Sequence, residues 1–214
     1  METMITFDFQ PDTVILGGGE YPTHTIPLHL LQSAPRVLCC DGAAEAYIMR
    51  GNIPWRIVGD GDSMTPEVRM KYADRIRIFS EQETNDQTKN VIYARDHGFK
   101  RIAIVGATGR REDHTIGNIS LLTEYYKMGL DVRIYTDHGM FVICNGSTDF
   151  AVRPGTQISI FNWKAHGFKS SGLKYPLYDF DALWMGTLNE ATNDAVTISA
   201  EGKYIVFVNY YIDF

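Results

Sequence analysis

The sequence predicts an N-terminal three-layer α/β domain with a mostly parallel sheet, residues 1–137, and a small C-terminal antiparallel β-sandwich or barrel, residues 138–214. Two observations support this fold class. Short apolar runs alternate with helical patterns over the first two-thirds of the chain, which is typical of βαβ units. After about Asp137 the helical spacing disappears, and short β-rich runs follow one another between turn residues. Hydrophobic residues make up 44% of the chain, which is enough for a buried core.

Six strands and five helices are expected in the α/β domain. The strands are Thr13–Leu16, Arg36–Cys40, Arg56–Val58, Arg75–Phe79, Arg101–Val105 and Val132–Thr136. The helices are Leu28–Ser33, Ala43–Arg50, Pro66–Tyr72, Asp86–His97 and Asp113–Met128. Thr65 is placed to cap the third helix, and Thr84 or Asn85 the fourth, while Gly98 is placed to end the fourth.

The C-terminal domain is expected to contain five short strands joined by turns. The strands are Met140–Cys144, Gln157–Phe161, Gly167–Ser170, Ala195–Ser199 and Tyr204–Asn209. The turns are expected at Gly146, Pro154-Gly155, Gly172 and Glu201-Gly202. Strands this short leave their order in the sheet open.

Charge and cysteine content exclude several classes of protein. The formal net charge is −6, and only Lys100-Arg101 and Arg110-Arg111 are adjacent basic pairs, so we expect no nucleic-acid partner. The three cysteines form no C-x-x-C motif and are best explained as small buried hydrophobic residues, as in a cytoplasmic protein. Neither a signal peptide nor an apolar run of membrane-spanning length is present, so we expect no membrane association.

Four aspartates stand where strands are expected to end or helices to begin. Asp41 follows one apolar run, Asp60 and Asp62 follow the next, and Asp86 opens an amphipathic segment. Ligands of open α/β sheets bind beyond the carboxyl ends of the strands, where carboxylates can hold Mg²⁺ against nucleotide phosphates. Taken alone, Asp41 is better explained as a helix N-cap, whereas the strand that leads into Asp60 and Asp62 favours a metal–phosphate site over an ordinary turn.

Two further segments add basic groups. Asp86 and Lys89 share a helix face, either as a surface ion pair or as groups that contact metal and phosphate. After the fifth expected strand, Gly106 permits a turn, Arg110 and Arg111 add positive charge, and the following helix offers free N–H groups to an anion.

The glycine-rich segment from Leu16 to Glu20 does not match a known nucleotide motif. Pro22 stands where a dinucleotide-binding fingerprint needs its last glycine, and the chain contains no Walker A pattern. ATP would therefore be held by a different arrangement.

Five segments in order resemble the motifs of the thiamine pyrophosphokinase family. They are Asp41-Gly42, Gly59 to Ser63, Asn85 to Lys89, Gly106 to Thr115 and Gly172 to Leu177. A sixth segment, Leu188 to Glu190, matches in part. Three positions differ from the family pattern: Asn85 replaces Thr, Arg110 replaces Gly and Leu188 replaces Ser. These differences leave the reaction class unchanged and affect the details of thiamine contact.

The resemblance implies an enzyme that transfers the diphosphate of ATP to the hydroxyl of thiamine, giving thiamine diphosphate and AMP with Mg²⁺. It also implies a homodimer, with thiamine between the first domain of one subunit and the second domain of its partner. The catalytic and metal-binding residues would be Asp41, Asp60, Asp62 and Asp86, with Asp60 or Asp86 accepting the hydroxyl proton. The ATP-binding residues would be Gln82, Lys89, Gly106, Thr108, Arg111, Asp113 and His114.

Thiamine is a cationic ring system, which an acidic and aromatic pocket suits. The candidate thiamine-binding residues are Tyr175, Trp184, Asn189 and Glu190. Core packing explains the two aromatic residues equally well. Two other functions remain open: a diphosphokinase for another small alcohol such as a hydroxymethylpterin, and a module that binds ATP or thiamine diphosphate without turnover.

Overall fold

The computed structural model describes residues 4–81 and 83–211. The chain divides into an α/β unit, residues 10–137, and a β-rich unit that joins residues 4–9 to residues 138–211. We expected residues 4–9 in the α/β domain. Instead Ile5 forms a bridge to Phe150, and its backbone bonds to Asp149 and Ala151 place this segment in the β-rich unit.

The α/β unit contains a parallel sheet with strand order β4-β3-β2-β1-β5-β6. Its strands are β1 Thr13–Leu16, β2 Val37–Cys40, β3 Arg56–Gly59, β4 Ile76–Ile78, β5 Arg101–Val105 and β6 Asp131–Tyr135. The chain builds outward from β1 to β4, then returns to the other side of β1 with β5. The prediction of a mostly parallel sheet is confirmed, and the order reverses between β1 and β5, where ligands of such sheets bind.

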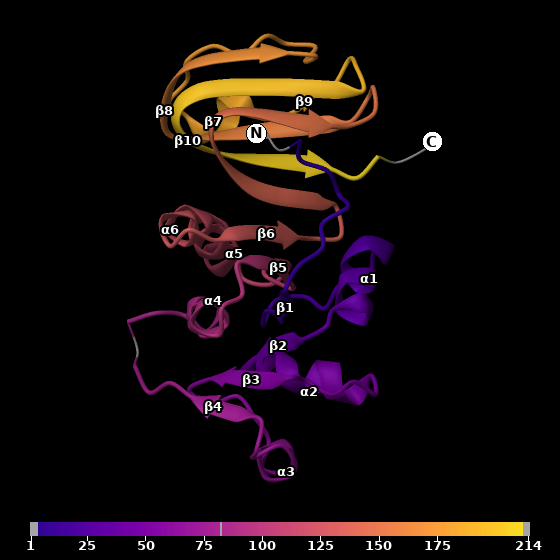
Figure 1. Cartoon of the computed structure of the whole chain (residues 1–214), viewed down its shortest axis with the longest axis vertical. Coiled ribbons are helices and arrows are strands. Elements are labelled where there is room, and N and C mark those ends of the chain that lie inside the picture. The colour runs from indigo at the N-terminus through magenta and orange to yellow at the C-terminus, as the bar shows by residue number, and fades with distance from the viewer. Residues whose placement is uncertain (1–3, 82, 212–214) are drawn as a thin grey trace. The chain divides into compact units, whose positions relative to one another are not determined.

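Helices cover both faces of this sheet. They are α1 Thr25–Ser33, α2 Asp41–Met49, α3 Pro66–Lys71, α4 Asp86–Asp96, α5 Glu112–Ser120 and α6 Leu122–Lys127. Within the unit, α1 and α2 lie on one side of the strands, and α4, α5 and α6 lie on the other (Figure 1). The expected caps are present, since Thr65 accepts from the Val68 N–H and Asn85 accepts from the Thr88 N–H.

The expected helix over residues 113–128 is divided in two. Leu121 separates α5 from α6. Just there the Ser120 hydroxyl donates to the Gly117 carbonyl at 2.7 Å, and the Thr123 hydroxyl donates to the Ser120 carbonyl at 2.9 Å. Hydroxyl groups that bond to nearby carbonyls compete with the helix ladder, and glycine weakens it further.

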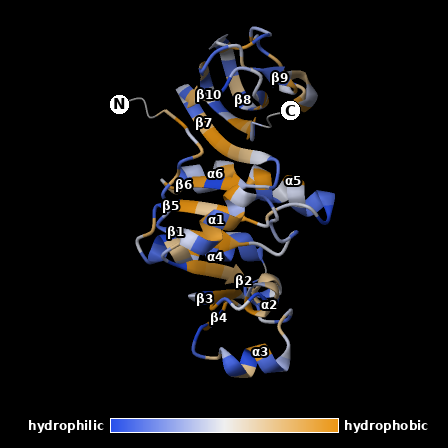
Figure 2. Ribbon diagram, turned by 90° about the vertical axis from the view of Figure 1, so that its right-hand side faces the viewer, coloured by the Kyte–Doolittle hydropathy of each residue, from blue (hydrophilic) through white to orange (hydrophobic). Residues whose placement is uncertain are grey.

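The sheet forms the core of the α/β unit. Ile15, Leu38, Ile57, Ile104 and Ile134 are fully buried, one on each of five strands. Figure 2 shows hydrophobic residues along β5 and β6. Burial on both faces explains the short continuous apolar runs that identified these strands in the sequence.

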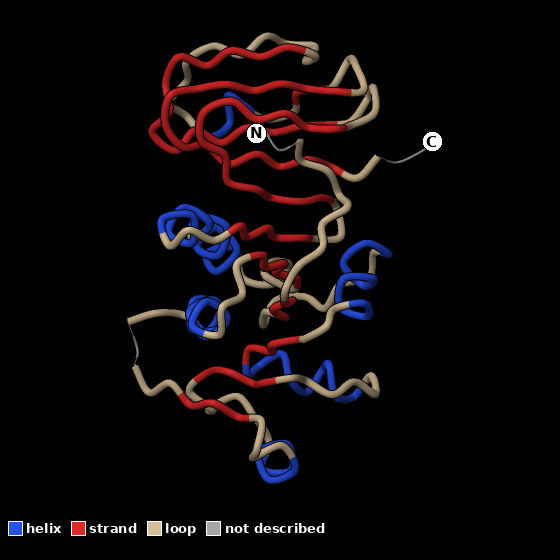
Figure 3. Tube along the Cα trace, in the orientation of Figure 1, coloured by secondary structure: helices blue, strands red, loops and turns tan. Residues whose placement is uncertain are grey.

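The β-rich unit is an antiparallel sheet with strand order β7-β10-β8-β9. Figure 3 draws its long strands in red and the connections between them in tan. Its elements are β7 Gly139–Ala151, β8 Gln157–Ser171, a 3₁₀ turn at Leu183–Gly186, β9 Asn189–Glu190 and β10 Ala195–Asn209. Both β8 and β10 run through two of the expected short strands. Gly146 and Gly202 have positive φ inside strands, and the register shifts between Ala200 and Lys203. Two glycines interpreted as turns therefore lie within long, irregular strands, one of them at a bulge.

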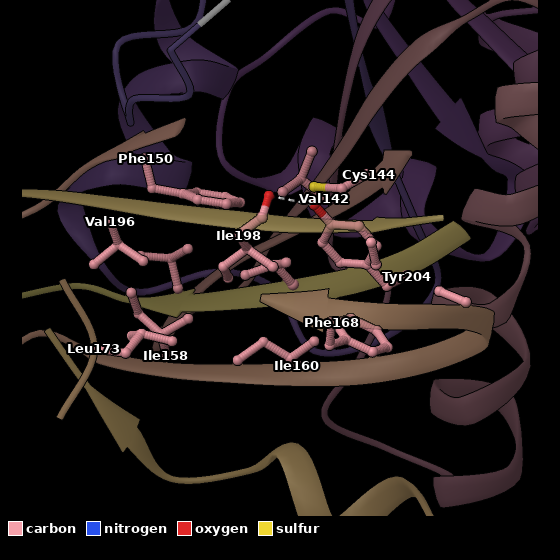
Figure 4. Close-up of a cluster of buried hydrophobic side chains, with 14 of the residues drawn as sticks. Val142, Cys144, Phe150, Ile158, Ile160, Phe168, Leu173, Val196, Ile198 and Tyr204 are labelled. Carbon is pink, nitrogen blue, oxygen red and sulfur yellow. Dashed lines mark hydrogen bonds between the residues drawn. The ribbon is translucent and has the colours of Figure 1, made fainter. Parts of the chain in front are cut away.

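An apolar cluster stabilises the β-rich unit. Figure 4 shows Phe150, Ile158, Ile160 and Val196 packed between the strands, all fully buried. The Tyr204 hydroxyl reaches the Ile198 carbonyl at 2.9 Å, which satisfies its polar group within the cluster.

The three cysteines, Cys39, Cys40 and Cys144, are buried and free, as expected for small core residues. In the part of the chain that the structure describes, no helix is long and apolar enough to cross a membrane.

Candidate active site

A cavity of about 510 Å³ lies at the carboxyl ends of the strands in the α/β unit. The loops after β1, β3 and β5 line it, together with the end of β2 and the first turns of α2, α4 and α5. Its position beside the β1–β5 reversal is where open α/β sheets bind ligands. Most of the sequence-predicted α/β site residues reach this cavity.

The glycine segment after β1 forms part of the cavity through backbone contacts. The Gly19 N–H donates to the Gly106 carbonyl at 2.7 Å, and the Glu20 N–H donates to the Thr108 carbonyl at 2.7 Å. A Cβ atom on Gly17 would lie 2.6 Å from the Gly106 oxygen, and one on Gly19 would collide with the Thr108 oxygen. Glycine is needed because two backbones lie side by side, a role that the sequence analysis did not assign.

Asp41 organises the loop after β3. Its carboxylate accepts N–H groups from Gly42 at 2.7 Å, Gly61 at 2.9 Å and Ser63 at 3.5 Å. The side chain is only 1% exposed, and a Cβ atom on Gly59 would lie 2.9 Å from its carboxyl carbon. The glycines of the GDGDS segment therefore allow the loop to fold closely around Asp41.

The two aspartates of that loop differ in position. Asp60 lines the cavity, and its Oδ1 accepts the Asp62 N–H at 3.1 Å. The Asp62 side chain is exposed and does not line the cavity. Asp60 thus joins Asp41 at the site, and the role expected for Asp62 stays a prediction.

Asp86 begins α4 and lines the cavity beside Asp41. Burial, together with the Asp41 carboxylate, raises the pKa of Asp86 to about 6. Lys89 acts in the opposite direction, with its Nζ 3.4 Å from Asp86 Oδ1. The Lys89 side chain is 3% exposed, so this is a buried cation rather than a surface ion pair.

The acidic side of the cavity, defined as Asp41, Asp60 and Asp86, suits a divalent cation. In the described residues, no three His, Cys, Asp or Glu side chains are gathered closely enough to hold a metal ion by themselves. Mg²⁺ nevertheless usually takes only one or two carboxylates, and waters and phosphate oxygens complete its coordination. The Asp41 carboxylate helps to raise the pKa of Asp86, so the negative charge of Asp86 is disfavoured beside it. A divalent cation bound between these carboxylates would stabilise that charge.

The basic side of the cavity, defined as Thr108, Arg110, Arg111 and His114, comes from the segment after β5. Arg111 donates to both carboxylate oxygens of Asp113, at 3.1 and 2.6 Å. These hydrogen bonds lower the pKa of Asp113 to about 2. Asp113 does not line the cavity and instead orients Arg111, while Gly106 shapes the turn with a φ of 67°.

The cavity also contains residues that the sequence analysis missed. Ser63, Thr115 and Asn118 line it, as does Asn85, which had been noted only as a cap and a departure from the family pattern. Asn118 donates to the Ala107 carbonyl at 2.8 Å and accepts from the Asn85 amide at 2.9 Å. Only its position one turn after His114, on the same helix, could have pointed to Asn118.

The predicted thiamine-binding residues do not line this cavity. Gln82 falls outside the described residues. In the β-rich unit, Tyr175 and Trp184 are exposed at 59% and 74%. Asn189 is buried and bonds to both backbone groups of Tyr175, and Glu190 lies 3.4 Å from the amine of Lys174. Their thiamine contacts stay predictions.

Comparisons with known proteins agree with this architecture. The family model described as the thiamin pyrophosphokinase catalytic domain matches residues 28–134, and the substrate-binding domain model matches residues 139–207. A comparison with curated protein sequences found no match.

Three solved structures show the shared fold. A thiamine pyrophosphokinase from Bacillus subtilis is 22% identical with a TM-score of 0.75, covering 94% of this chain and 99% of its own. The Candida albicans enzyme is 16% identical with a TM-score of 0.79, covering 98% and 96%. The yeast enzyme is 15% identical with a TM-score of 0.76, covering 95% and 88%. Because its two domain models together span most of the chain, this protein belongs to the thiamin pyrophosphokinase family.

Proposed function

We propose that this protein transfers the diphosphate of ATP to the hydroxyl of thiamine, releasing AMP. One observation carries the proposal: a single cavity at the sheet reversal has carboxylates on one side and cationic groups on the other. Such a division suits a metal-bound triphosphate, because phosphoryl transfer depends on positioning and on charge stabilisation. The cavity also falls within the part of the chain that matches the catalytic-domain model.

The triphosphate would lie between the two sides of the cavity. Arg111 and His114 would contact its oxygens, with the N–H groups around Thr108 as further donors. Lys89, which is buried beside Asp86, would add positive charge. Asp41, Asp60 and Asp86 would hold Mg²⁺, which when bound would neutralise charge on the phosphate oxygens.

The reaction is a substitution at the β-phosphorus of ATP. The thiamine hydroxyl oxygen forms a bond to this phosphorus, and the bond to the α,β-bridging oxygen breaks. The electron pair of that bond leaves with AMP, and the hydroxyl proton passes to the carboxylate of Asp60 or Asp86. Lys89 and Arg111 stabilise the charge that builds on the bridging and non-bridging oxygens.

The β-rich unit would supply contacts to thiamine. It matches the family's substrate-binding domain model, and its Tyr175 and Trp184 expose aromatic surface that suits a cationic ring. Asn189 would fix the Tyr175 backbone, and Glu190 would add negative charge. We propose that these contacts form in a homodimer, across two subunits.

A coupled assay of AMP formation tests the proposal. Purified protein is given ATP and MgCl₂ with thiamine, with 6-hydroxymethylpterin, or with no acceptor. We expect AMP only with thiamine, and none after EDTA treatment. AMP formation with the pterin alone would show that the pterin, and not thiamine, is the acceptor. ATP binding without AMP formation from any acceptor would indicate a sensing module.

A further inference from the structure

Two elements that are distant in sequence carry the two sides of the cavity. Asp86, on the acidic side, is the first residue of α4. The basic side begins at Thr108, in the loop after β5. A triphosphate held by both sides requires these elements to keep a fixed separation, because displacements of about 1 Å can cost about 100-fold in rate.

A chain of side-chain hydrogen bonds spans that separation. The Asn85 amide donates to Asn118 Oδ1 at 2.9 Å, and the Asn118 amide donates to the Ala107 carbonyl at 2.8 Å. Asn85 Oδ1 also accepts the Thr88 N–H at 2.9 Å, which caps α4. The residue before Asp86 is thereby joined through Asn118 to the residue before Thr108.

A second set of contacts fixes the first turn of α4 next to these hydrogen bonds. The buried Gln87 amide lies 3.2 Å from the Asn118 carbonyl and 3.3 Å from the Tyr125 hydroxyl. The Thr88 hydroxyl also lies 2.9 Å from the Tyr125 hydroxyl. The first turn of α4 is thus anchored to α5 and α6 below, while Asn85 and Asn118 face the cavity.

We propose that Asn85 and Asn118 are a positioning pair that holds the basic side of the cavity in register with Asp86. Asparagine suits position 85 because its oxygen caps the helix while its amide donates across the cavity. A serine or threonine would keep the cap, but its single, shorter hydroxyl cannot also reach Asn118 while it accepts from Thr88. The kinetic part of this inference rests on the proposed function.

Asn85→Ser and Asn118→Ser test the pair by kinetics. We expect kcat to fall about tenfold in Asn85→Ser and about 100-fold in Asn118→Ser, because the second change breaks both bonds. The KM for ATP should change less than about threefold, since the groups that contact phosphate remain. The double variant should match Asn118→Ser alone rather than multiply the two losses.

Asn52→Ser is the matched control. Asn52 also donates its amide to a backbone carbonyl of this unit, that of Tyr47 at 3.2 Å, but it does not line the cavity. Its kcat should equal that of the parent protein. Losses that multiply in the double variant, or a kcat loss of equal size in Asn52→Ser, would overturn the proposal.

Amide hydrogen exchange followed by NMR on the metal-free protein provides a readout that needs no turnover. The N–H groups of Gly19 and Glu20 donate to the loop carbonyls of Gly106 and Thr108, so they report its mobility. Asn85→Ser should speed their exchange about three- to tenfold, with no change at Gly17, which donates to the end of β5. Unchanged exchange would overturn the inference, whereas absent AMP formation in the parent protein would overturn only the proposed function.

Discussion

The two sides of the cavity are built differently. On the acidic side, Asp41 is 1% exposed and accepts three backbone N–H groups, and Lys89 beside Asp86 is 3% exposed. On the basic side, Arg111 is 70% exposed, and it pairs with Asp113, which is 62% exposed and lies outside the cavity. The acidic side is therefore fixed by the fold before any ligand binds, while the basic side depends on long side chains in solvent. Substitutions should separate the two, with chemistry lost on one side and ATP affinity on the other.

The largest effect is expected from Asp60→Asn. It removes a cavity-lining carboxylate with little change in shape, so kcat should fall about 1,000-fold while the protein stays folded. Steady-state AMP formation and circular dichroism would measure the two properties. Asp74→Asn is the control, because Asp74 is 78% exposed and lies outside the cavity. Parent-like activity in Asp60→Asn would show that the acidic side does not take part in the chemistry.

Asp62→Asn sharpens the comparison within one loop. We expect it to remove most turnover, by about 100-fold, with the fold intact, if all four aspartates serve the metal–phosphate centre. The exposed position of Asp62 makes this the most demanding test of that assignment. Full activity in this variant would restrict the centre to Asp41, Asp60 and Asp86.

Arg111→Ala tests the basic side. Arg111 would contact the triphosphate in the bound substrate as well as in the transition state, so its loss should raise the KM for ATP about tenfold and change kcat less. The thermal unfolding midpoint should not move, since exposed ion pairs contribute little to stability. Arg95→Ala is the matched control: Arg95 also pairs with a neighbouring acid, Asp96, at 2.8 Å, but away from the cavity. An unchanged KM in Arg111→Ala would contradict a phosphate contact.

The smallest expected effect concerns stability. The folded protein raises the pKa of Asp86 from 3.8 to about 6, so between these values the folded state binds more protons than the unfolded state. Stability therefore falls as pH rises through this window, and the loss is complete above about pH 6. In EDTA at pH 7.5, Asp86→Asn should gain about 1–2 kcal/mol in free energy of unfolding, after allowance for partial solvent screening.

Urea unfolding at pH 7.5 and at pH 3.5 checks this prediction. The gain should largely disappear at the lower pH, where Asp86 is protonated in the folded state and mostly protonated in the unfolded state. A gain of the same size at both pH values would show that the Asp41–Asp86 charge interaction is not its cause.

Local pattern was sufficient to predict much of this molecule. Short runs of three to five residues identified the strands, and the carboxyl-end rule brought Asp41, Asp60 and Asp86 to one cavity without knowledge of strand order. Capping chemistry identified Thr65 and limited the cap of the fourth helix to Thr84 or Asn85, of which Asn85 makes the bond, because a cap is specified by residues within one turn.

Features that depend on non-local pairing were not predictable. The glycines after β1 are explained only by the neighbouring loop after β5, about 90 residues away in the sequence. Gly202 was interpreted as a turn, but it lies at a bulge within β10. The strand continues past this bulge because it pairs with β7 and β8, and such pairing is not visible in the local sequence. The Asn85–Asn118 contact likewise requires the docking of α4 against α5.

The contact between the glycine segment and the segment from Gly106 to Thr108 limits how this protein can diverge. Surface connections usually tolerate added residues, because they have solvent on one side. Here the two backbones hydrogen-bond directly to each other, and no space remains for a methyl group at Gly17 or Gly19. An insertion in either connection would have to be matched by a compensating change in the other, so the two should vary together among descendants of this sequence.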